Sequence, residues 1–324
     1  MALASRAMSR LRELYVNILR QSRRDNQRGF DYPSRMHRES LAPLMEQLEP
    51  RLLLSVSFQD PTTYLFEGSE PDSLVIEDFD RDGRNDIAFA DWGNSVVRLL
   101  RGTGGGAFSS LPTVSAGTLP IGVATADFNG DAKPDLAVTT CDDESGSGGR
   151  VIVFLGRGDG TFIHSNEYVT GALPNSIAVG DFDQDNKADL AVTNLRDSTV
   201  SVLIGKGDGT FKTATNFVLG SPRPVYVGVG DCNGDGREDL AVLSWGVTGN
   251  LDVLLGQPDG NFSAAYTFDA GDRPQGQLAV GDFNGDGRSD VAVPALYGNT
   301  IKVYLGHPTN ILSLNHTYQN AFRA

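Results

Sequence analysis

The chain has 324 residues, a net charge of −14 and 38 Gly residues. So much glycine favours many turns over long helices, and a hydrophobic content of 40% is sufficient for a folded core. Residues 1–54 carry ten Arg, no Lys and six acidic residues, which leaves a net charge of −18 on residues 55–324. A surface this acidic repels phosphate backbones, so we expect cations rather than nucleic acid as its partners.

A change of composition near residue 55 predicts an N-terminal extension of residues 1–55 and a main domain of residues 56–324. Apolar side chains recur at helical spacing from Met8 to Ile18, with several Arg nearby, which predicts a short basic amphipathic helix. This extension is either mostly helical, with a role in targeting or at a membrane surface, or disordered and solvated. No apolar run reaches the ~18–20 residues that a transmembrane span needs.

One acidic segment of nine residues recurs five times in the main domain. We number these segments loops 1 to 5: residues 78–86, 127–135, 181–189, 231–239 and 282–290. Their first residues are 49, 54, 50 and 51 positions apart. A period of ~40–50 residues with strand-like patterning is typical of β-propeller blades. The sequence therefore predicts an all-β fold, a β-propeller of four-stranded blades with five visible units.

The fourth period shows how one blade is expected to be built. Its predicted strands are residues 225–230, 240–244, 251–255 and 262–268, with loop 4 between the first two. Gly-Asp-Gly segments at corresponding places in other periods predict tight hairpin turns, because Gly adopts positive φ without steric cost. Small residues are expected in the strand before each loop, where blades crowd around a central axis. These are Ala124, Ala178, Gly228 and Ala279.

The two ends of the repeat determine whether a ring can close. Five complete units are followed by no further loop, and an additional outer strand is predicted near residues 57–66. Such a strand latches a closed ring of five blades, or it is the remnant of a larger, incomplete ring. The two Cys residues, Cys141 and Cys232, fall in non-adjacent units and are predicted to be isolated buried thiols.

Each loop places side-chain oxygens at its positions 1, 3, 5 and 9, and these positions hold 17 carboxylates in all. Like charges packed within ~4–5 Å repel each other by more than ~1 kcal/mol per pair. A hard divalent cation removes that repulsion, and ligands that are all oxygen select Ca²⁺ over Zn²⁺ or Cu²⁺. We therefore predict up to five calcium sites, each with the backbone carbonyl of position 7 as a further ligand. The predicted ligands are Asp78, Asp80, Asp82, Arg84, Asp86, Asp127, Asn129, Asp131, Lys133, Asp135, Asp181, Asp183, Asp185, Lys187, Asp189, Asp231, Asn233, Asp235, Arg237, Asp239, Asp282, Asn284, Asp286, Arg288 and Asp290.

The spacing within the loops differs from that of an EF-hand, which needs Glu at position 12 between two helices. Position 12 here is Phe or Val in a predicted strand, so Asp at position 9 is expected to close the site. Position 6 needs a residue that tolerates left-handed backbone. Ala132 departs from that requirement and makes loop 2 the weakest predicted site. The alternative is five Asx-turns that hold no metal.

The loops and their setting, such as Ala-Val-Gly-Asp-Phe-Asn-Gly-Asp-Gly-Arg-Ser-Asp at residues 279–290, resemble the FG-GAP/VCBS repeat of integrin-α-like propellers. The resemblance covers about residues 57–320. It implies Ca²⁺ binding through positions 1, 3, 5 and 9 of the loops, on one face of a disc whose other face binds most ligands. Members commonly have seven blades, whereas this chain has five units. Residues 48–55, Leu-Glu-Pro-Arg-Leu-Leu-Leu-Ser, resemble the LEPR-XLL segment of certain large bacterial surface proteins, which implies export.

Aromatic residues mark the turns expected opposite the loops. Trp92 and Trp245 each follow a position-9 Asp by six residues, and Tyr297 lies at the matching turn of the last unit. Exposed rings offer flat surfaces to sugars or partner loops, or else they pack between blades. The four His form no His-x-x-x-His pair, and the sequence contains no nucleophile elbow and no phosphate-binding loop.

These features predict a non-catalytic, calcium-binding module of the extracellular space or cell surface, with a role in binding or adhesion. Its expected ligand is an extracellular protein or a glycan. The alternatives are a lectin-like carbohydrate-binding propeller and an enzyme that acts on a polysaccharide. A glycan ligand would use Trp92, Trp245 and Tyr297.

Overall fold

The computed structural model describes residues 62–66, 71–143, 145–274, 276–295, 299–309 and 311–319, all within the unit Pro61–Ala324. The predicted N-terminal helix, the LEPR-XLL-like segment and Tyr297 lie outside these residues, and the boundary at residue 55 stays a prediction. The described regular structure consists of strands and one short 3-10 turn, η1 (Pro258–Gly260), which confirms the all-β fold. In this part of the chain, no helix is long and apolar enough to span a bilayer.

The strands form five antiparallel sheets in which consecutive strands of the chain pair with each other. The first sheet contains β1 (Pro71–Glu77), β2 (Asp86–Asp91), β3 (Val96–Gly104) and β4 (Ala107–Ser110), with β5 (Val114–Ser115) also paired to β3. The second contains β6 (Val123–Ala126), β7 (Asp135–Thr140), β8 (Arg150–Gly156) and β9 (Phe162–Val169). The third contains β10 (Pro174–Gly180), β11 (Asp189–Asn194), β12 (Thr199–Leu203) and β13 (Thr215–Val218). The fourth contains β14 (Pro224–Gly230), β15 (Asp239–Ser244), β16 (Thr248–Leu254) and β17 (Tyr266–Asp272). The fifth contains β18 (Ala279–Gly281), β19 (Asp290–Ala295), β20 (Thr300–His307) and β21 (Ile311–Gln319).

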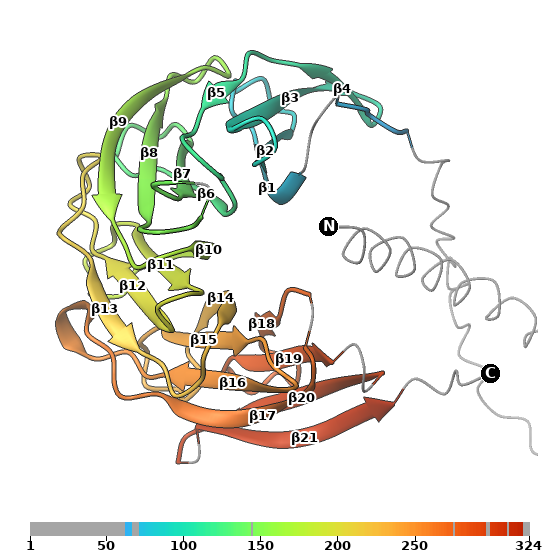
Figure 1. Cartoon of the computed structure of the whole chain (residues 1–324), viewed down its shortest axis with the longest axis vertical. Coiled ribbons are helices and arrows are strands. Elements are labelled where there is room, and N and C mark those ends of the chain that lie inside the picture. Colours follow the sequence, from blue (N-terminus) through green and yellow to red (C-terminus); the bar gives the residue numbers. More distant parts are fainter. Residues whose placement is uncertain are drawn as a thin grey trace, which may run out of the picture. The chain divides into compact units, whose positions relative to one another are not determined.

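The five sheets follow one another in chain order along an arc (Figure 1). The first strand of each sheet lies on the inner side of the arc, and the fourth strand lies on the outer side. Neighbouring sheets contact each other mainly through their inner strands, as between β10 and β14. This is the arrangement of blades around a propeller axis. The predicted four-stranded blades are therefore confirmed.

The second strand of each blade is the most deeply buried element. All six residues of β7, of β11 and of β15 are buried, because a neighbouring sheet covers each face of these strands. The outer strand β9 instead exposes most of its residues. A fully buried second strand and a more exposed outer strand are the pattern that stacked blades require.

The described hydrophobic core consists of four clusters, each shared by two neighbouring blades. Position 2 of the loops contributes to them: the ring of Phe182 packs edge-on against Phe262 of the next blade, with ring centroids 5.4 Å apart. The interface is tight at Gly228, because a Cβ there would lie 2.6 Å from side-chain methyl carbons of Leu278 and Val280 of the fifth blade. The predicted crowding of inner strands is thus present at this residue.

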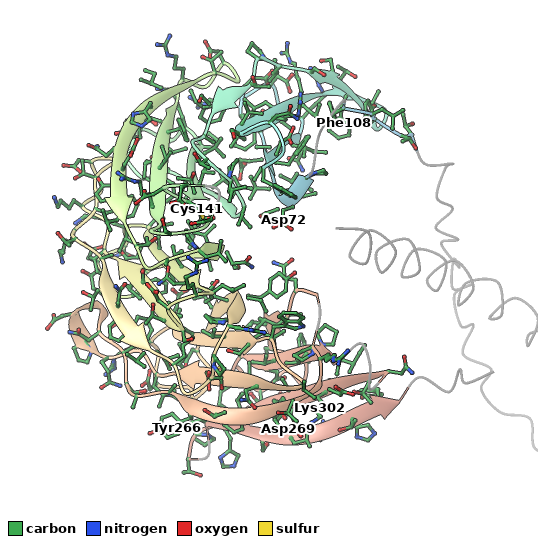
Figure 2. All side chains as sticks on the ribbon, viewed as in Figure 1. Asp72, Phe108, Cys141, Tyr266, Asp269 and Lys302 are labelled. Atoms are coloured by element: carbon green, nitrogen blue, oxygen red, sulfur yellow. The ribbon has the colours of Figure 1, made fainter. Side chains whose placement is uncertain are left out.

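Polar and sulfur-containing side chains also lie within and between the blades (Figure 2). Cys141 and Cys232 are free and buried, as predicted. Lys302 of β20 joins the fourth and fifth blades, since its Nζ donates to Oδ2 of Asp269 at 2.7 Å.

Both ends of the arc expose side chains that are buried at the same repeat position elsewhere. Leu74 on β1 is 59% exposed, whereas Ile177, four residues before loop 3, is 9% exposed. On β20 of the last blade, Ile301 is 49% exposed, while its counterpart Leu251 is fully buried. Among the described strands, no substantial contact joins the first sheet to the fifth. The structure therefore holds five blades of a ring that these blades do not close among themselves.

Two local predictions are wrong. The described part of the additional outer strand, residues 62–66, forms no strand, because β4 and β5 already pair with the outer edge of β3. Residues of this segment contact the first blade through side chains instead: Tyr64 Oη accepts a hydrogen bond from Phe108 N at 2.8 Å. In the fourth blade, the outer strand begins at Tyr266 rather than at Phe262, which makes an isolated bridge to Gly256.

Candidate calcium loops and the opposite ends of the blades

The five acidic loops occupy the same place in every blade, between the first strand and the second. Position 9 of each loop is the first residue of the second strand, from Asp86 on β2 to Asp290 on β19. The predicted site residues are therefore brought together loop by loop, in five separate clusters.

The first position of each loop organises the turn through both of its carboxylate oxygens. In loop 3, Asp181 Oδ1 accepts from Asp185 N at 2.9 Å, and its Oδ2 accepts from Asn186 N at 2.9 Å. This Asx-type bonding bends the chain so that position 6 has left-handed backbone. The φ values at position 6 are 83° for Gly83, 60° for Ala132, 61° for Asn186, 84° for Gly236 and 84° for Gly287. The predicted requirement at position 6 is confirmed, and Ala132 meets it with strain.

The aspartate at position 9 has a second role that the sequence analysis missed. In loop 3, Asp189 Oδ2 accepts from Phe182 N at 2.8 Å and Oδ1 accepts from Gly205 N at 2.7 Å. The same pair of bonds recurs in the other four loops. The carboxylate thus fastens its own loop to the end of the third strand. The Gly that recurs at this place is the sequence signal for this close approach, since a Cβ at Gly205 would lie 2.2 Å from the carbonyl oxygen of Ala188.

Burial shifts the protonation of these position-9 carboxyls. Desolvation raises the pKa of Asp135, Asp189 and Asp239 to about 6 in each case, although backbone N–H donors pull the pKa down. The nearby loop carboxylates add to the rise, for example Asp183 beside Asp189. These groups hold negative charge at a free-energy cost that a bound cation would remove.

Two loops bring three carboxylates together closely enough to hold one ion. One oxygen each from Asp78, Asp80 and Asp86 lie within 4.8 Å of one another, and Asp181, Asp183 and Asp189 form the same group in loop 3. The other loops have Asn at position 3, so their third oxygen comes from an amide.

A Ca²⁺ ion fits the donor set of loop 3. The donors are all oxygens, and Asp183 Oδ1 is a buried acceptor without a hydrogen-bond partner. A hard cation at this place would satisfy that orphaned oxygen.

Basic side chains also reach the loop carboxylates. Lys187 Nζ at position 7 donates to Asp185 Oδ2 at position 5, at 2.7 Å, and Lys133 does the same in loop 2. In loop 1, Arg101 forms an ion pair with Asp80 at position 3. The equivalent residue on the third strand of other blades is apolar, as with Ile204. Loop 3 has Ile204 in place of Arg101, but the exposed Lys212 places its Nζ 3.6 Å from Asp183 Oδ2.

The loops are also joined to the next blade. Gly160, in the predicted Gly-Asp-Gly turn of the second blade, donates from its N to the carbonyl oxygen of Phe79 in loop 1 at 3.1 Å. Gly209 donates likewise to Phe128 of loop 2 at 2.8 Å. In loop 3, Asp181 N donates to Glu238 of the fourth blade at 2.7 Å. The conformation of a loop therefore helps to fix the distance between its blade and the next.

The predicted aromatic surface lies at the other ends of the second strands. Trp92 is half-buried after β2, and Trp245 is 40% exposed after β15. The guanidinium carbon of Arg223 lies 5.7 Å from the ring centroid of Trp245. Trp245 lines a hollow of about 320 Å³. The contact between Arg223 and the ring of Trp245 was not predicted from the sequence, although the turn that carries Arg223 was expected on the same face.

Sheets arranged as blades, each with an acidic loop between its first two strands, define a repeat β-propeller. The family model of the FG-GAP-like repeat matches residues 78–138, 144–192, 181–242 and 231–293, which is more than half of the chain. The chain belongs to the FG-GAP-like repeat family.

Solved structures share the fold at low sequence identity. A functionally unknown protein from Desulfotomaculum acetoxidans is similar with a TM-score of 0.59 and 13% identity, over 79% of this chain and 72% of that chain. A protein from Lactobacillus plantarum is similar with a TM-score of 0.56 and 14% identity, over 76% and 70% of the two chains. A lectin from Agrocybe aegerita that recognises non-reducing terminal N-acetylglucosamine gives a TM-score of 0.49 and 18% identity, over 76% and 64%. A comparison with curated proteins gives no match.

Proposed function

We propose that this chain is a calcium-stabilised binding or adhesion module of the extracellular space or cell surface, without catalytic activity. The observation that carries the proposal is loop 3, where three carboxylates converge and the buried Asp183 Oδ1 has no hydrogen-bond partner. The chain would bind up to five Ca²⁺ ions, one in each loop. In each loop the side chains of positions 1, 3, 5 and 9 and the backbone carbonyl of position 7 would be the ligands.

Bound Ca²⁺ would act on the stability of the blades. Each ion would neutralise carboxylates that now repel one another, and it would hold a loop that hydrogen-bonds to the next blade, as Asp181 does with Glu238. Fixing the loops would fix the relative positions of the blades, and hence of the turns at their opposite ends. The calcium ions would therefore support a ligand surface without touching the ligand.

The chemistry of the loops favours an extracellular setting. Extracellular calcium modules bind with dissociation constants of ~10⁻⁴–10⁻³ M, so such sites are filled where calcium is millimolar. The net charge of −18 on residues 55–324 makes nucleic acid a poor partner. We infer an extracellular protein or a glycan as the ligand.

The second candidate function is a lectin-like one, and the exposed ring of Trp245 at the hollow favours it. An apolar ring face stacks on the C–H groups of a sugar, and a neighbouring polar group orients it. The described lining of the hollow, by contrast, contains no His and no carboxylate. An enzyme that acts on a polysaccharide would need acid–base groups there.

Arrays of glycans and of purified extracellular proteins test this function on the full chain. Binding would be measured in millimolar calcium and in a chelator, and the polysaccharides that bind would be followed for release of reducing ends. We expect saturable, calcium-dependent binding without release. Binding to neither array would contradict the module, and the release of reducing ends would establish the enzyme instead.

A further inference from the structure

A hollow of about 320 Å³ lies at the ends of the fourth and fifth blades that are opposite the acidic loops. It is lined by Arg223, Trp245, Gly246, Val247 and Arg273. All five residues lie in turns outside the strands: one before β14, three between β15 and β16, and one between β17 and β18. Its volume is at the lower end of the range for small-ligand pockets, about 300–1,000 Å³.

The repeat shows that the fold does not require this pair of arginine and tryptophan. In the third blade, Leu195 N donates to the carbonyl oxygen of Leu173 at 3.0 Å, and in the fourth blade Trp245 N donates to that of Arg223 at 2.9 Å. Leu173 and Arg223 also share a positive φ, 54° and 59°, before a proline. The same backbone thus carries two leucines in one blade and an arginine with a tryptophan in the next. Packing alone leaves the second pair unexplained.

The chemistry of the lining points to a ligand with both a carboxylate and an apolar face. Arg223 and Arg273 bring two guanidinium groups to one hollow, on a chain whose net charge is −14. None of the five lining residues is acidic. Guanidinium groups bind carboxylates through paired, charge-assisted hydrogen bonds. Trp245 and Val247, which are 40% and 72% exposed, supply apolar surface beside them.

We propose that this hollow binds a carboxylate-bearing sugar, the uronic acid unit of an acidic glycan. The proposal rests on the proposed function, because it names the ligand class of that binding module. The carboxylate is held by Arg223 and Arg273, and the C–H face of the sugar ring stacks against Trp245. An acidic peptide fits less well, because no strand edge lines the hollow to pair with a peptide backbone.

Titration with an oligomer of galacturonic acid tests the proposal, and its methyl ester is the matched ligand without charge. In the Trp92→Phe variant, Trp245 is the only tryptophan and reports binding by its fluorescence. We expect a saturable change with the acid, at least about tenfold weaker binding of the ester, and weaker binding as salt increases.

Variants that follow the sequence of the third blade locate the site, with affinities measured by calorimetry. Arg223→Leu and Trp245→Leu introduce the residue type that the third blade carries, so the fold is expected to be kept. The single variants Arg223→Leu, Trp245→Leu and Arg273→Leu should each weaken binding of the acid about tenfold or more. Arg196→Leu is the matched control, because Arg196 is an exposed arginine on the adjoining turn of the third blade, bonded to Ser145 O at 2.7 Å. It should leave the affinity unchanged.

The outcomes separate this inference from the proposed function. The uronic acid site would be overturned by equal affinity for acid and ester, or by no binding of either. It would also be overturned if Arg196→Leu weakened binding of the acid as much as the variants of the hollow do. Tighter binding of an oligomer of glutamate than of galacturonate would overturn the sugar assignment. If calcium still raises the melting temperature and the arrays still give a ligand in any of these cases, the binding module stands and only the uronic acid site fails.

Discussion

Two aspartates of loop 3 allow the calcium role to be separated from the structural role. Asp183 Oδ1 has no hydrogen-bond partner, whereas Asp189 accepts one backbone N–H on each oxygen. Asp183→Asn and Asp189→Asn each remove one negative charge and keep the side-chain volume. We predict that the first change acts mainly when calcium is present, and that the second acts with and without it.

The magnitudes follow from the contacts. Asp189→Asn places an amide N–H against a buried backbone N–H and removes a bond to a charged acceptor, which is worth about 1.5–3 kcal/mol. Burial makes the charge of Asp189 unfavourable and raises its pKa to about 6. Removal of that charge offsets part of the loss. We therefore expect the free energy of unfolding in chelator to fall by about 2 kcal/mol. Asp183→Asn should change it by less than about 0.5 kcal/mol, because the ion pair that is lost, with the exposed Lys212 at 3.6 Å, is weak and three other loops carry Asn there.

Calcium at about 1 mM should add about 0.4–1.4 kcal/mol through loop 3, for a dissociation constant of ~10⁻³–10⁻⁴ M. Both variants should reduce this increment, Asp183→Asn only in part, because loops 2, 4 and 5 carry Asn at the same position and are also predicted calcium sites. Urea unfolding in chelator and in millimolar calcium measures the free energy of unfolding without the ion and the increment that calcium adds. Asp259→Asn is the control for loss of one exposed negative charge. Equal destabilisation by the two variants in chelator would refute the separate roles. A full calcium increment in Asp183→Asn would refute the assignment of Asp183 as a ligand.

Three further predictions concern strain, competition and pH. Ala132→Gly should raise the free energy of unfolding by about 0.5–1 kcal/mol in urea unfolding. Left-handed backbone costs a residue with a Cβ about 1–2 kcal/mol, and the greater freedom of Gly in the unfolded chain cancels part of the gain. Asn186→Gly should gain less, since Asn tolerates a φ of 61°. Arg101→Leu should raise the calcium affinity of loop 1 about tenfold or less in calorimetry, because it removes the cation paired with Asp80 and introduces an apolar residue as in other blades. In chelator, stability should fall as pH rises from 3.8 to about 6, because in that window the native position-9 carboxyls still bind protons that the unfolded chain has lost. In calcium, the rise in melting temperature should disappear as pH falls below about 6, since protons compete with the ion.

Each of these predictions has an opposing result. Destabilisation by Ala132→Gly would mean that the left-handed turn carries no strain. Unchanged calorimetry for Arg101→Leu would mean that its guanidinium does not compete with calcium. A calcium effect that persists unchanged well below pH 6 would exclude the position-9 carboxyls as ligands.

Features that repeat along the chain could be predicted from the sequence. The interval between the loops indicated blades, and the loop spacing indicated left-handed backbone at position 6, which Ala132 adopts despite its side chain. That Cys141 and Cys232 are free also followed from their places in non-adjacent units. These features depend on residues close together in one repeat, so a single sequence contains them.

Features that depend on contacts between repeats could not be predicted in the same way. Asp189 looked like a metal ligand only, because its bond to Gly205 depends on where the third strand ends. The position of Arg223 beside Trp245 depends on the path of the turn before β14. The exposed Leu74 marks a blade face that no neighbouring blade covers. The length of the repeat alone does not predict how tightly successive blades curve around the axis.

The most direct test of the calcium assignment is equilibrium dialysis of the chelator-stripped, folded protein against calcium raised into the millimolar range, with the bound ions counted per chain. We predict saturable binding that reaches up to five ions per chain, with weaker binding of one ion in Asp183→Asn. A protein that folds as described but binds no calcium at millimolar concentration would contradict the central claim.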